Sequence, residues 1–274
     1  MELNGQTIVI TGASSGIGAA AARALQGRGA RLVIVGRSPE ATRRVAGELG
    51  ADYHLADFAR LADVRALAAT LLERYPQIDV LTNNAGGLMG DRVVTEDGHE
   101  LTFQVNHLAP FLLTALLLDC LVASRARVIN TSSAGNRFGH VDLDDLDNAR
   151  GYNAFRDYGT AKLMNILHAR ELQHRYGEAG LNAASFHPGI VATGFARAGK
   201  GPIAFVYNSF TKIFLISPQR GANTLIWLAS TEPGHDWQGG GYYARRKPGR
   251  TNPQADDLVL ARQFYDASAR LVGL

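Results

Sequence analysis

The chain is poor in cysteine and in net charge. Cys120 is the only cysteine among 274 residues, so no disulfide within the chain is possible, which is compatible with a reducing compartment. It lies in the apolar run 111–122, and we interpret it as a small buried hydrophobic residue. Lys and Arg number 28 against 25 Asp and Glu, a net charge of +3. The basic residues are spread along the chain without interleaved aromatics, which disfavours nucleic acid as a partner.

Segments that direct proteins into or across a membrane are also lacking. The first residues show no basic region followed by an apolar core, so no signal peptide is indicated. The apolar stretch after Pro202 is interrupted by Asn208, Ser209 and Lys212, and it is too short and too polar to span a bilayer. We therefore expect no membrane span and a cytoplasmic protein.

Metal ligands in a recognisable spacing are missing too. Four aspartates lie close together between positions 142 and 147. They lack the glycine and the terminal glutamate of a calcium-binding EF-hand loop. We interpret them as part of a solvated loop and predict no metal site.

The chain does contain an alternation of short apolar runs with helical patterns. Its hydrophobic content of 46% and charged content of 19% are globular values. Strands that are apolar throughout and alternate with helices indicate a parallel sheet covered on both faces. The predicted strands are 7–10, 31–35, 53–56, 78–82, 127–131, 181–186 and 241–244. The predicted helices are 17–26, 39–49, 60–75, 100–121, 158–176 and 218–229.

This alternation predicts an α/β fold. We expect a doubly wound Rossmann fold with a mostly seven-stranded parallel sheet flanked by helices on both faces. No linker or internal repeat divides the chain, so residues 1–274 are expected to form a single dinucleotide-binding domain. Segments 136–157 and 194–217 do not fit the alternation. Both follow the ends of strands, where α/β sheets bind ligands.

A glycine-rich turn follows the first strand and opens the first helix. Its sequence is Thr11-Gly12-Ala13-Ser14-Ser15-Gly16-Ile17-Gly18. Gly12 permits a tight turn, and Gly16 and Gly18 let the backbone approach a pyrophosphate and let the helix pack on the strand. The N–H groups at the start of the helix would face the phosphates. This context favours a dinucleotide site over an ordinary turn.

The end of the second strand indicates which dinucleotide binds. An NAD site carries an Asp or Glu about 20 residues beyond the glycines. The sequence here is Gly36-Arg37-Ser38. Arg37 is always charged and can bind in a bidentate manner, which suits the 2′-phosphate of NADP(H). We predict NADP(H). The alternative is a surface arginine at a helix start, although a cation there opposes the helix dipole.

Two later turns also follow strands. Asp57 and Phe58 come after the third strand, and the Asp57 carboxylate either accepts a hydrogen bond from adenine or caps the helix that begins near Arg60. The sequence leaves both interpretations open. Asn83-Asn84-Ala85-Gly86 follows the fourth strand, and its small residues permit close approach of a cofactor.

The stretch Tyr158-Gly159-Thr160-Ala161-Lys162 places a phenol and an ammonium four residues apart, on one face of a helix. A nearby cation favours the phenolate and lowers the tyrosine pKa from about 10. Such a tyrosine can exchange a proton with an oxygen near neutral pH. A packed ring beside a solvated amine gives the same spacing, so the pair gains meaning only from the rest of the chain.

In their order and spacing these motifs resemble those of the short-chain dehydrogenase/reductase family over the whole chain. The matching residues are Thr11–Gly18, Asn83–Gly86, Asn106, Ser133, Tyr158–Lys162 and His187-Pro188-Gly189. Segments 105–114, 162–167, 187–193 and 241–274 are similar to the retinol-dehydrogenase-like branch, in which a long separation of Ser133 from Tyr158 is usual. Many members of that branch carry an N-terminal membrane anchor, which we do not expect here, so the resemblance supports the chemistry better than a retinoid substrate.

The resemblance implies a catalytic set of Asn106, Ser133, Tyr158 and Lys162. In such enzymes the tyrosine exchanges a proton with the substrate oxygen and the serine holds that oxygen. The lysine contacts the nicotinamide ribose and lowers the tyrosine pKa, and the asparagine holds a water in a proton path. We choose Ser133 over Ser132 because the family's serine is the second of the pair.

The predicted cofactor-binding residues combine the turns above with the positions that the resemblance implies. They are Gly12, Ser14, Ser15, Gly16, Ile17, Gly18, Arg37, Asp57, Phe58, Asn84, Ala85, Gly86, Thr131, Tyr158, Lys162, Pro188, Gly189, Val191 and Thr193. The resemblance implies that the segment from Pro188 to Thr193 closes around the nicotinamide. His187 is expected to be structural.

The aromatic-rich segment 194–217 bears on the substrate. The sequence leaves open whether it is a substrate lid, an amphipathic helix packed on the core or on another subunit, or a weak membrane-surface contact. We expect an apolar or aromatic carbonyl or alcohol as substrate, and a homo-oligomer because family members commonly assemble.

The predicted function is an NADP(H)-dependent oxidoreductase. It would transfer a hydride between nicotinamide and such a substrate, with Tyr158 as proton donor or acceptor. The alternatives are a non-catalytic NADP(H)-binding regulatory protein and a nucleotide-sugar epimerase or dehydratase.

Overall fold

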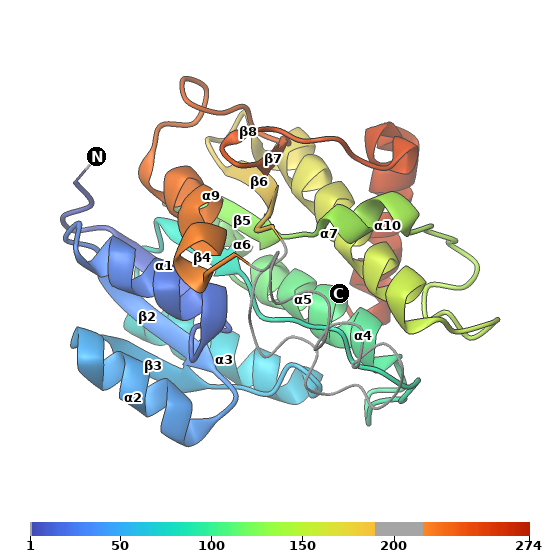
Figure 1. Ribbon diagram of the computed structural model, residues 1–274, viewed down its shortest axis with the longest axis horizontal. Helices are drawn as coiled ribbons and strands as arrows, with labels where there is room; N and C mark the ends of the chain where they lie inside the picture. Colours follow the sequence, from blue (N-terminus) through green and yellow to red (C-terminus); the bar gives the residue numbers. More distant parts are fainter. Residues whose placement is uncertain (1, 190–215) are drawn as a thin grey trace.

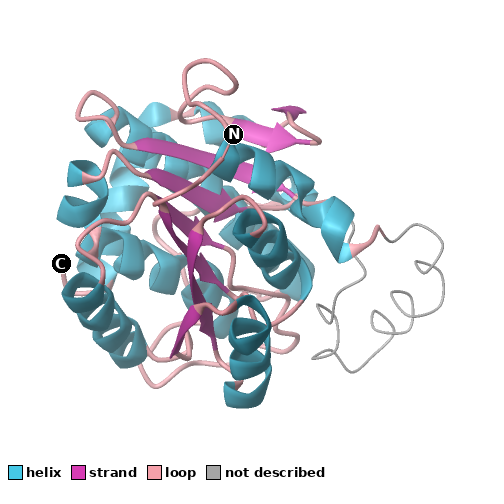
Figure 2. Ribbon diagram, turned by 90° about the vertical axis from the view of Figure 1, so that its left-hand side faces the viewer, coloured by secondary structure: helices cyan, strands magenta, loops and turns pink. Residues whose placement is uncertain are grey.

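The computed structural model describes residues 2–189 and 216–274, in which a sheet lies between two layers of helices (Figures 1 and 2). The strands are β1 (Thr7–Thr11), β2 (Arg31–Gly36), β3 (Asp52–Leu55), β4 (Val80–Asn83), β5 (Arg127–Thr131), β6 (Asn182–His187), β7 (Tyr242–Ala244) and β8 (Lys247–Pro248). The α-helices are α1 (Gly16–Gln26), α2 (Pro39–Leu49), α3 (Leu61–Arg74), α4 (Leu101–Phe103), α5 (Ala109–Leu116), α6 (Leu118–Ala123), α7 (Ala154–Tyr176), α9 (Pro218–Ser230) and α10 (Leu258–Leu271). A π-helical turn, η1 (Gln104–Leu108), and two 3₁₀ turns, η2 (Ala134–Phe138) and η4 (Pro253–Asp256), complete the described elements.

The sheet has the strand order β3-β2-β1-β4-β5-β6-β7-β8. Strands β1 to β7 pair in parallel, and β8 pairs antiparallel to β7. The chain winds outward from β1 to β3 and then in the other direction from β4, so the order reverses between β1 and β4. In open α/β sheets, ligands bind outside the carboxyl ends of the strands at this point. The predicted doubly wound α/β fold is confirmed, with β8 as an additional short strand.

Both faces of the sheet are buried, which explains why its inner strands are rich in apolar residues. Successive side chains of a strand point to opposite faces. Accordingly, Val9 packs in the core cluster that includes residues of α3, α5, α7 and α10, whereas Ile8 and Ile10 pack in the cluster that includes residues of α1 and α9. All five residues of β1 are buried.

The predicted long helix 100–121 is interrupted in the structure. The π-helical turn η1 follows α4, and a break at Leu117 separates α5 from α6. A π turn accommodates an extra residue. Such turns are rare in proteins as a whole, and those that occur often lie at functional sites. Asn106 lies in the middle of this turn.

Helix α7 begins four residues earlier than predicted. Asn153 caps it, because its side-chain oxygen accepts hydrogen bonds from the N–H groups of Phe155 and Arg156. Tyr158 therefore lies in the second turn of the helix instead of at its start.

Helix α10 was not predicted. It begins after Asp257, whose carboxylate accepts hydrogen bonds from the N–H groups of Val259 and Leu260. Its buried face packs beside α7 (Figure 1). The buried residues of that face are Ala261, Phe264, Tyr265 and Ser268.

Two negative findings concern the described residues alone. Within 2–189 and 216–274, no helix is long and apolar enough to cross a bilayer. Over the same ranges, no three His, Cys, Asp or Glu side chains gather as the ligands of a metal ion would.

Candidate active site

The turn between β1 and α1 lies in contact with the turn after β4. Gly12 has φ +66°, and a Cβ on it would lie 2.7 Å from the Cα of Ala85. A Cβ on Gly18 would lie 2.6 Å from the carbonyl oxygen of Gly12. Both positions therefore require glycine, because backbone occupies the space that a side chain needs.

The start of α1 suits the diphosphate of a dinucleotide. Its N-cap residue, Ser15, makes no side-chain capping hydrogen bond, and no acidic residue lies in the first turn. The first N–H groups of the helix thus have no capping side chain, and the positive end of the helix dipole has no negative charge beside it. Phosphate oxygens can supply both the acceptors and the charge. The residues present fit the cofactor that the fold implies.

Asn84 ties the ends of three strands together. Its Nδ2 donates to the carbonyl oxygen of Thr11 at 3.0 Å, and its Oδ1 accepts from the Thr131 hydroxyl at 3.3 Å. The Thr11 hydroxyl in turn accepts from the backbone N–H groups of Asn84 and Ala85. These bonds fix the path of the turn that leads to Gly86.

Gly86, Asn106 and Lys162 meet at this turn. Gly86 has φ +150°, and a Cβ on it would lie 2.4 Å from Asn106 Oδ1 and 3.2 Å from Lys162 Nζ. The Asn106 side chain is fully buried and accepts from Gly87 N at 3.0 Å. Its Nδ2 donates to the carbonyl oxygens of Gly87 and Thr102, each at 2.9 Å. All of its side-chain donors and one acceptor site are used to hold it against the β4 turn.

Lys162 is a buried amine placed beside the Tyr158 ring. Its Nζ lies 5.4 Å from the centre of that ring and donates to the Thr131 carbonyl at 3.3 Å. The residue is 3% exposed, and burial lowers the pKa of its amine from 10.5 to about 7. A negative charge developing nearby would favour the protonated amine. The phenol and the amine converge on the same face of α7, as their spacing predicts.

The two neighbouring serines differ in their surroundings. Ser132 is buried, and its hydroxyl donates to the Lys162 carbonyl at 2.6 Å. The Ser133 hydroxyl accepts from Gly135 N at 3.1 Å. A Cβ on Gly135 would lie 3.5 Å from Ser133 Oγ and 3.8 Å from Tyr158 Cδ1, so Ser133 and Tyr158 flank the same glycine. The Ser133 hydroxyl therefore lies on the side of Gly135 and the Tyr158 ring, whereas that of Ser132 is bonded to the backbone of α7.

His187 joins two turns of the site. Its Nδ1 accepts from Ala134 N at 3.2 Å and from Gly189 N at 3.3 Å. Burial, with a smaller effect of the nearby Arg245, lowers the pKa of His187 to about 4, so the ring remains a neutral acceptor. This arrangement agrees with the structural role expected for it. Val191, Thr193 and segment 194–215 lie outside the described residues.

Arg37 and Asp57 come together at the ends of β2 and β3. Arg37 Nη1 lies 3.9 Å from Asp57 Oδ1, and the Arg37 side chain is 75% exposed. Asp57 Oδ1 also accepts from Ala59 N at 3.1 Å. The interpretation in which Asp57 caps α3 is not observed, because the first N–H of that helix, on Leu61, donates to Asp97.

Phe58 is 5% exposed, and its side chain belongs to the hydrophobic core. Only its backbone is therefore left for a contact with adenine. The sequence shows the residue type and position, but the direction in which the ring packs follows from the tertiary structure.

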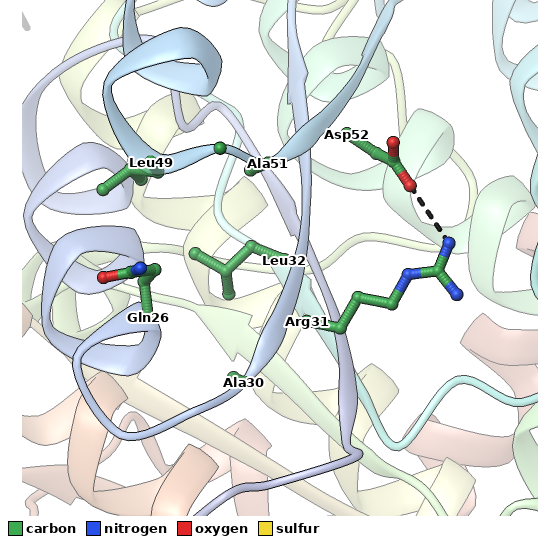
Figure 3. A pocket seen from close by; sticks show the side chains of 8 residues that line it. Gln26, Ala30, Arg31, Leu32, Leu49, Ala51 and Asp52 are labelled. Atoms are coloured by element: carbon green, nitrogen blue, oxygen red, sulfur yellow. Dashed lines mark hydrogen bonds and ion pairs between the residues drawn. The ribbon is translucent and has the colours of Figure 1, made fainter.

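A hollow at the opposite edge of the sheet contains none of the predicted site residues. It has a volume of about 350 Å³ and lies where β2 and β3 begin (Figure 3). Gln26, Leu32 and Leu49 help to line it, and Arg31 and Asp52 at its rim pair with each other at 3.2 Å. The candidate site is therefore the carboxyl edge, where the polar side chains gather.

Three polar residues near the site, Asn165, His107 and Ser268, are not among the predicted site residues. Asn165 Nδ2 donates to the same Thr131 carbonyl as Lys162, at 3.1 Å. Because Asn165 follows Lys162 by three residues on a helix, the sequence could have indicated that the two side chains lie on the same face. His107 follows Asn106 in the π turn and lies 3.0 Å from the Ser268 hydroxyl of α10. No sequence signal joins His107 to Ser268.

Comparison with known proteins identifies the family. Residues 6–200 match the family model described as short chain dehydrogenase, and the chain belongs to this family. It is 44% identical over 278 residues to the protein of Streptomyces sp. (strain C5) named "Putative daunorubicin C-13 ketoreductase DnrU", covering 99% of this chain and 94% of the relative. It is 36% identical over 295 residues to retinol dehydrogenase 14 of Homo sapiens, covering 99% and 88%. The predicted likeness to the retinol-dehydrogenase-like branch is confirmed.

Solved structures agree with this assignment. An uncharacterized protein from Mycobacterium paratuberculosis is similar with a TM-score of 0.80 and 29% identity, over 99% of this chain and 94% of the other. The Pseudomonas aeruginosa RhlG/NADP active-site complex is similar with a TM-score of 0.70 and 28% identity, over 88% and 94%. The chain is therefore an oxidoreductase of a family that uses a nicotinamide dinucleotide.

Proposed function

We propose that this protein is an NADP(H)-dependent reductase of an apolar ketone or aldehyde, which can also run as an alcohol dehydrogenase, with Tyr158 as the proton donor or acceptor. The observation that carries the proposal is the buried amine of Lys162, 5.4 Å from the centre of the Tyr158 ring and next to the Gly86 turn. The alternative of a binding protein without turnover gives no reason to bury this amine beside a phenol.

The chain's own residues supply position and a proton. The bound dinucleotide supplies the hydride chemistry. In reduction, negative charge develops on the substrate oxygen, and a phenol O–H with a cation behind it stabilises that charge. Ser133 holds the oxygen, Tyr158 donates the proton, and Lys162 compensates the charge left on the phenol. In oxidation Tyr158 accepts the proton instead.

The choice of NADP(H) over NAD(H) rests on Arg37. It is exposed at the end of β2, where a carboxylate would be needed to accept hydrogen bonds from the ribose hydroxyls of NAD. A guanidinium suits a 2′-phosphate because it can form two parallel charge-assisted hydrogen bonds. The presence of NADP in the similar RhlG structure supports this choice.

The choice of an apolar ketone rests on the relatives. The name of the 44% identical protein specifies a ketone at C-13 of daunorubicin, and the name of the 36% identical one specifies retinol. We extend the shared carbonyl–alcohol chemistry to this chain, as a single domain in a cytoplasmic homo-oligomer. Our hypothesis that 194–217 covers the substrate belongs to the same proposal.

Tyr158→Phe tests the proposal. NADPH oxidation is followed with a panel of aromatic ketones, aldehydes and quinones. The variant is expected to lose about 10²–10⁴-fold in kcat while binding NADPH with unchanged affinity, because only the proton donor is removed. Tyr53→Phe, which removes an exposed phenol from β3, is the matched control and should retain the rate.

The outcomes separate the hypotheses. If Tyr158→Phe keeps the wild-type rate, Tyr158 is not the proton donor. A wild-type protein that binds NADPH but turns over no carbonyl of the panel would favour the regulatory alternative.

A further inference from the structure

The π turn that carries Asn106 is braced by a helix from the other end of the chain. His107, the next residue, is fully buried, and its Nε2 lies 3.0 Å from the Ser268 hydroxyl. Ser268 is itself fully buried on α10. The two residues are 161 positions apart, and the hydrogen bond joins η1 to α10 directly.

The ring of His107 is enclosed on several sides by other rings. The Phe103 ring stacks on it at 5.8 Å between centroids, and the Phe264 ring of α10 lies at 4.6 Å. Phe111 and His168 each lie at 5.8 Å. A ring packed in this way has little freedom to move. The contact of Nε2 with the Ser268 hydroxyl additionally selects which edge of the ring points toward α10.

Both buried imidazoles of this cluster stay neutral. Burial, with a smaller effect of His168, lowers the pKa of His107 well below its usual value, and burial lowers the pKa of His168 to about 3. A neutral imidazole has one donor and one acceptor nitrogen. The Ser268 hydroxyl can pair with Nε2 in either tautomer of His107, because a hydroxyl both donates and accepts.

Asn106 points from the same turn toward the site. Its amide spans Gly87 and Thr102, and its Oδ1 is the atom that a Cβ on Gly86 would meet at 2.4 Å. Asn106 and His107 are adjacent in this turn, so the two residues share a peptide unit. A displacement of His107 toward α10 or away from it must move the Asn106 backbone as well.

We propose that Ser268 is a positioning residue for catalysis, which acts through His107 to hold the π turn so that Asn106 keeps its place in the site. This inference rests on the proposed function and on the role in its catalytic set that the family resemblance implies for Asn106. It assigns to α10 a role in the reaction, in addition to its packing against α7.

Ser268→Ala, Ser268→Thr and a double-mutant cycle test the inference. Ser268→Ala is expected to lower kcat about 10–100-fold, as small misplacements of catalytic groups do, with the affinity for NADPH within about twofold of the wild type. Ser268→Thr keeps the hydroxyl and should recover most of the rate. In the Asn106→Ala background, Ser268→Ala should lower kcat by less than about twofold, because the group through which it acts is already gone.

Tyr265→Phe is the matched control. It removes a hydroxyl from the same helix, three residues earlier, but that hydroxyl bonds to Tyr176 and not to η1. The control should keep the wild-type kcat even if its melting temperature falls as much as that of Ser268→Ala. All rates are measured well below the lowest melting temperature.

Three results would overturn the inference. The first is a wild-type kcat in Ser268→Ala, and the second is an equal loss of kcat in Tyr265→Phe. The third is a loss of kcat from Ser268→Ala that is as large in the Asn106→Ala background as in the wild type. If Asn106→Ala itself keeps the wild-type rate, Asn106 has no catalytic role and this inference fails, whereas the proposed role of Tyr158 is decided separately by Tyr158→Phe.

Discussion

Two charged groups at opposite edges of the sheet, Asp52 and Lys162, have different surroundings. At the amino edge, Asp52 Oδ2 lies 3.2 Å from Arg31 Nη2 and accepts from the Tyr75 hydroxyl at 3.0 Å, while Asp52 Oδ1 lies 3.8 Å from Arg74. At the carboxyl edge, Lys162 is buried, and its amine donates to a peptide carbonyl. The ion pairs among the described residues do not include Lys162.

The difference is consistent with the proposed function, which assigns the chemistry to the carboxyl edge. Exposed ion pairs such as those of Asp52 each contribute little to stability, because water screens the charges and ordering the side chains costs entropy. A buried amine without a carboxylate destabilises the folded chain, because desolvation of the charge is not compensated. Such a group is consistent with a site where a ligand later provides the missing charge or hydrogen bonds.

The largest effect is expected where the buried amine is removed. Lys162→Met should lower kcat about 10²–10⁴-fold, since the phenol of Tyr158 loses the cation that favours its ionised form. Steady-state NADPH oxidation measures this loss. Lys247→Met, which removes an exposed amine from β8, should leave kcat unchanged. If the two substitutions lower kcat equally, the loss in Lys162→Met cannot be assigned to a catalytic role of this amine.

The same substitution should change the pH dependence of stability. The pKa of Lys162 is about 7 in the folded, cofactor-free chain and about 10.5 when unfolded. Between these values the unfolded state binds the extra proton, so this amine makes stability rise with pH, by up to ~1.4 kcal/mol per pH unit.

Urea unfolding of the cofactor-free wild type and of Lys162→Met from pH 7 to pH 10 checks this. The difference between the two curves should rise with pH in favour of the wild type, because only the wild type has the buried amine. A flat difference would mean that the amine is solvated in the folded chain.

A smaller effect is expected at Arg37, on the carboxyl edge but outside the catalytic set. Arg37→Asp should weaken the binding of NADPH by roughly 1.5–3 kcal/mol and that of NADH far less, if one charge-assisted pair is lost. Fluorescence titration with each cofactor gives both affinities. Equal weakening would leave the preference for NADP(H) without support.

The smallest effect is expected at the amino edge. Asp52→Asn should lower the free energy of unfolding by about 1 kcal/mol, because it weakens exposed ion pairs and one hydrogen bond. It should leave kcat and KM unchanged. A large loss of rate here would contradict the assignment of chemistry to the other edge.

Much of the site could be predicted because its signals are local. The glycine-rich turn, the absence of an acid beside Arg37 and the four-residue spacing of Tyr158 and Lys162 each depend on a few neighbouring residues. The structure then places Tyr158 and Lys162 side by side and gives Gly12 its positive φ. The periodic apolar runs likewise predicted the order of the parallel strands along the chain.

The errors concern features that depend on packing. A continuous helical pattern at 100–121 does not reveal the π turn at 104–108, because the extra residue is accommodated only against neighbouring elements. Helix α10 has an N-cap, Asp257, and apolar residues at helical spacing. No strand follows it, so the alternation of strands and helices did not indicate a helix there. The sequence likewise did not show that the Phe58 ring points into the hydrophobic core.

The sequence by itself determined the class of fold and the chemical groups of the site, because strand and helix periods, glycine turns and helical spacing are short-range properties of the chain. Only the tertiary structure decided which of these groups are buried and what they touch. Burial of Lys162, the different surroundings of Ser132 and Ser133, and the contact of His107 with Ser268 arise from segments far apart in the chain, and desolvation and hydrogen bonding act on the assembled neighbours.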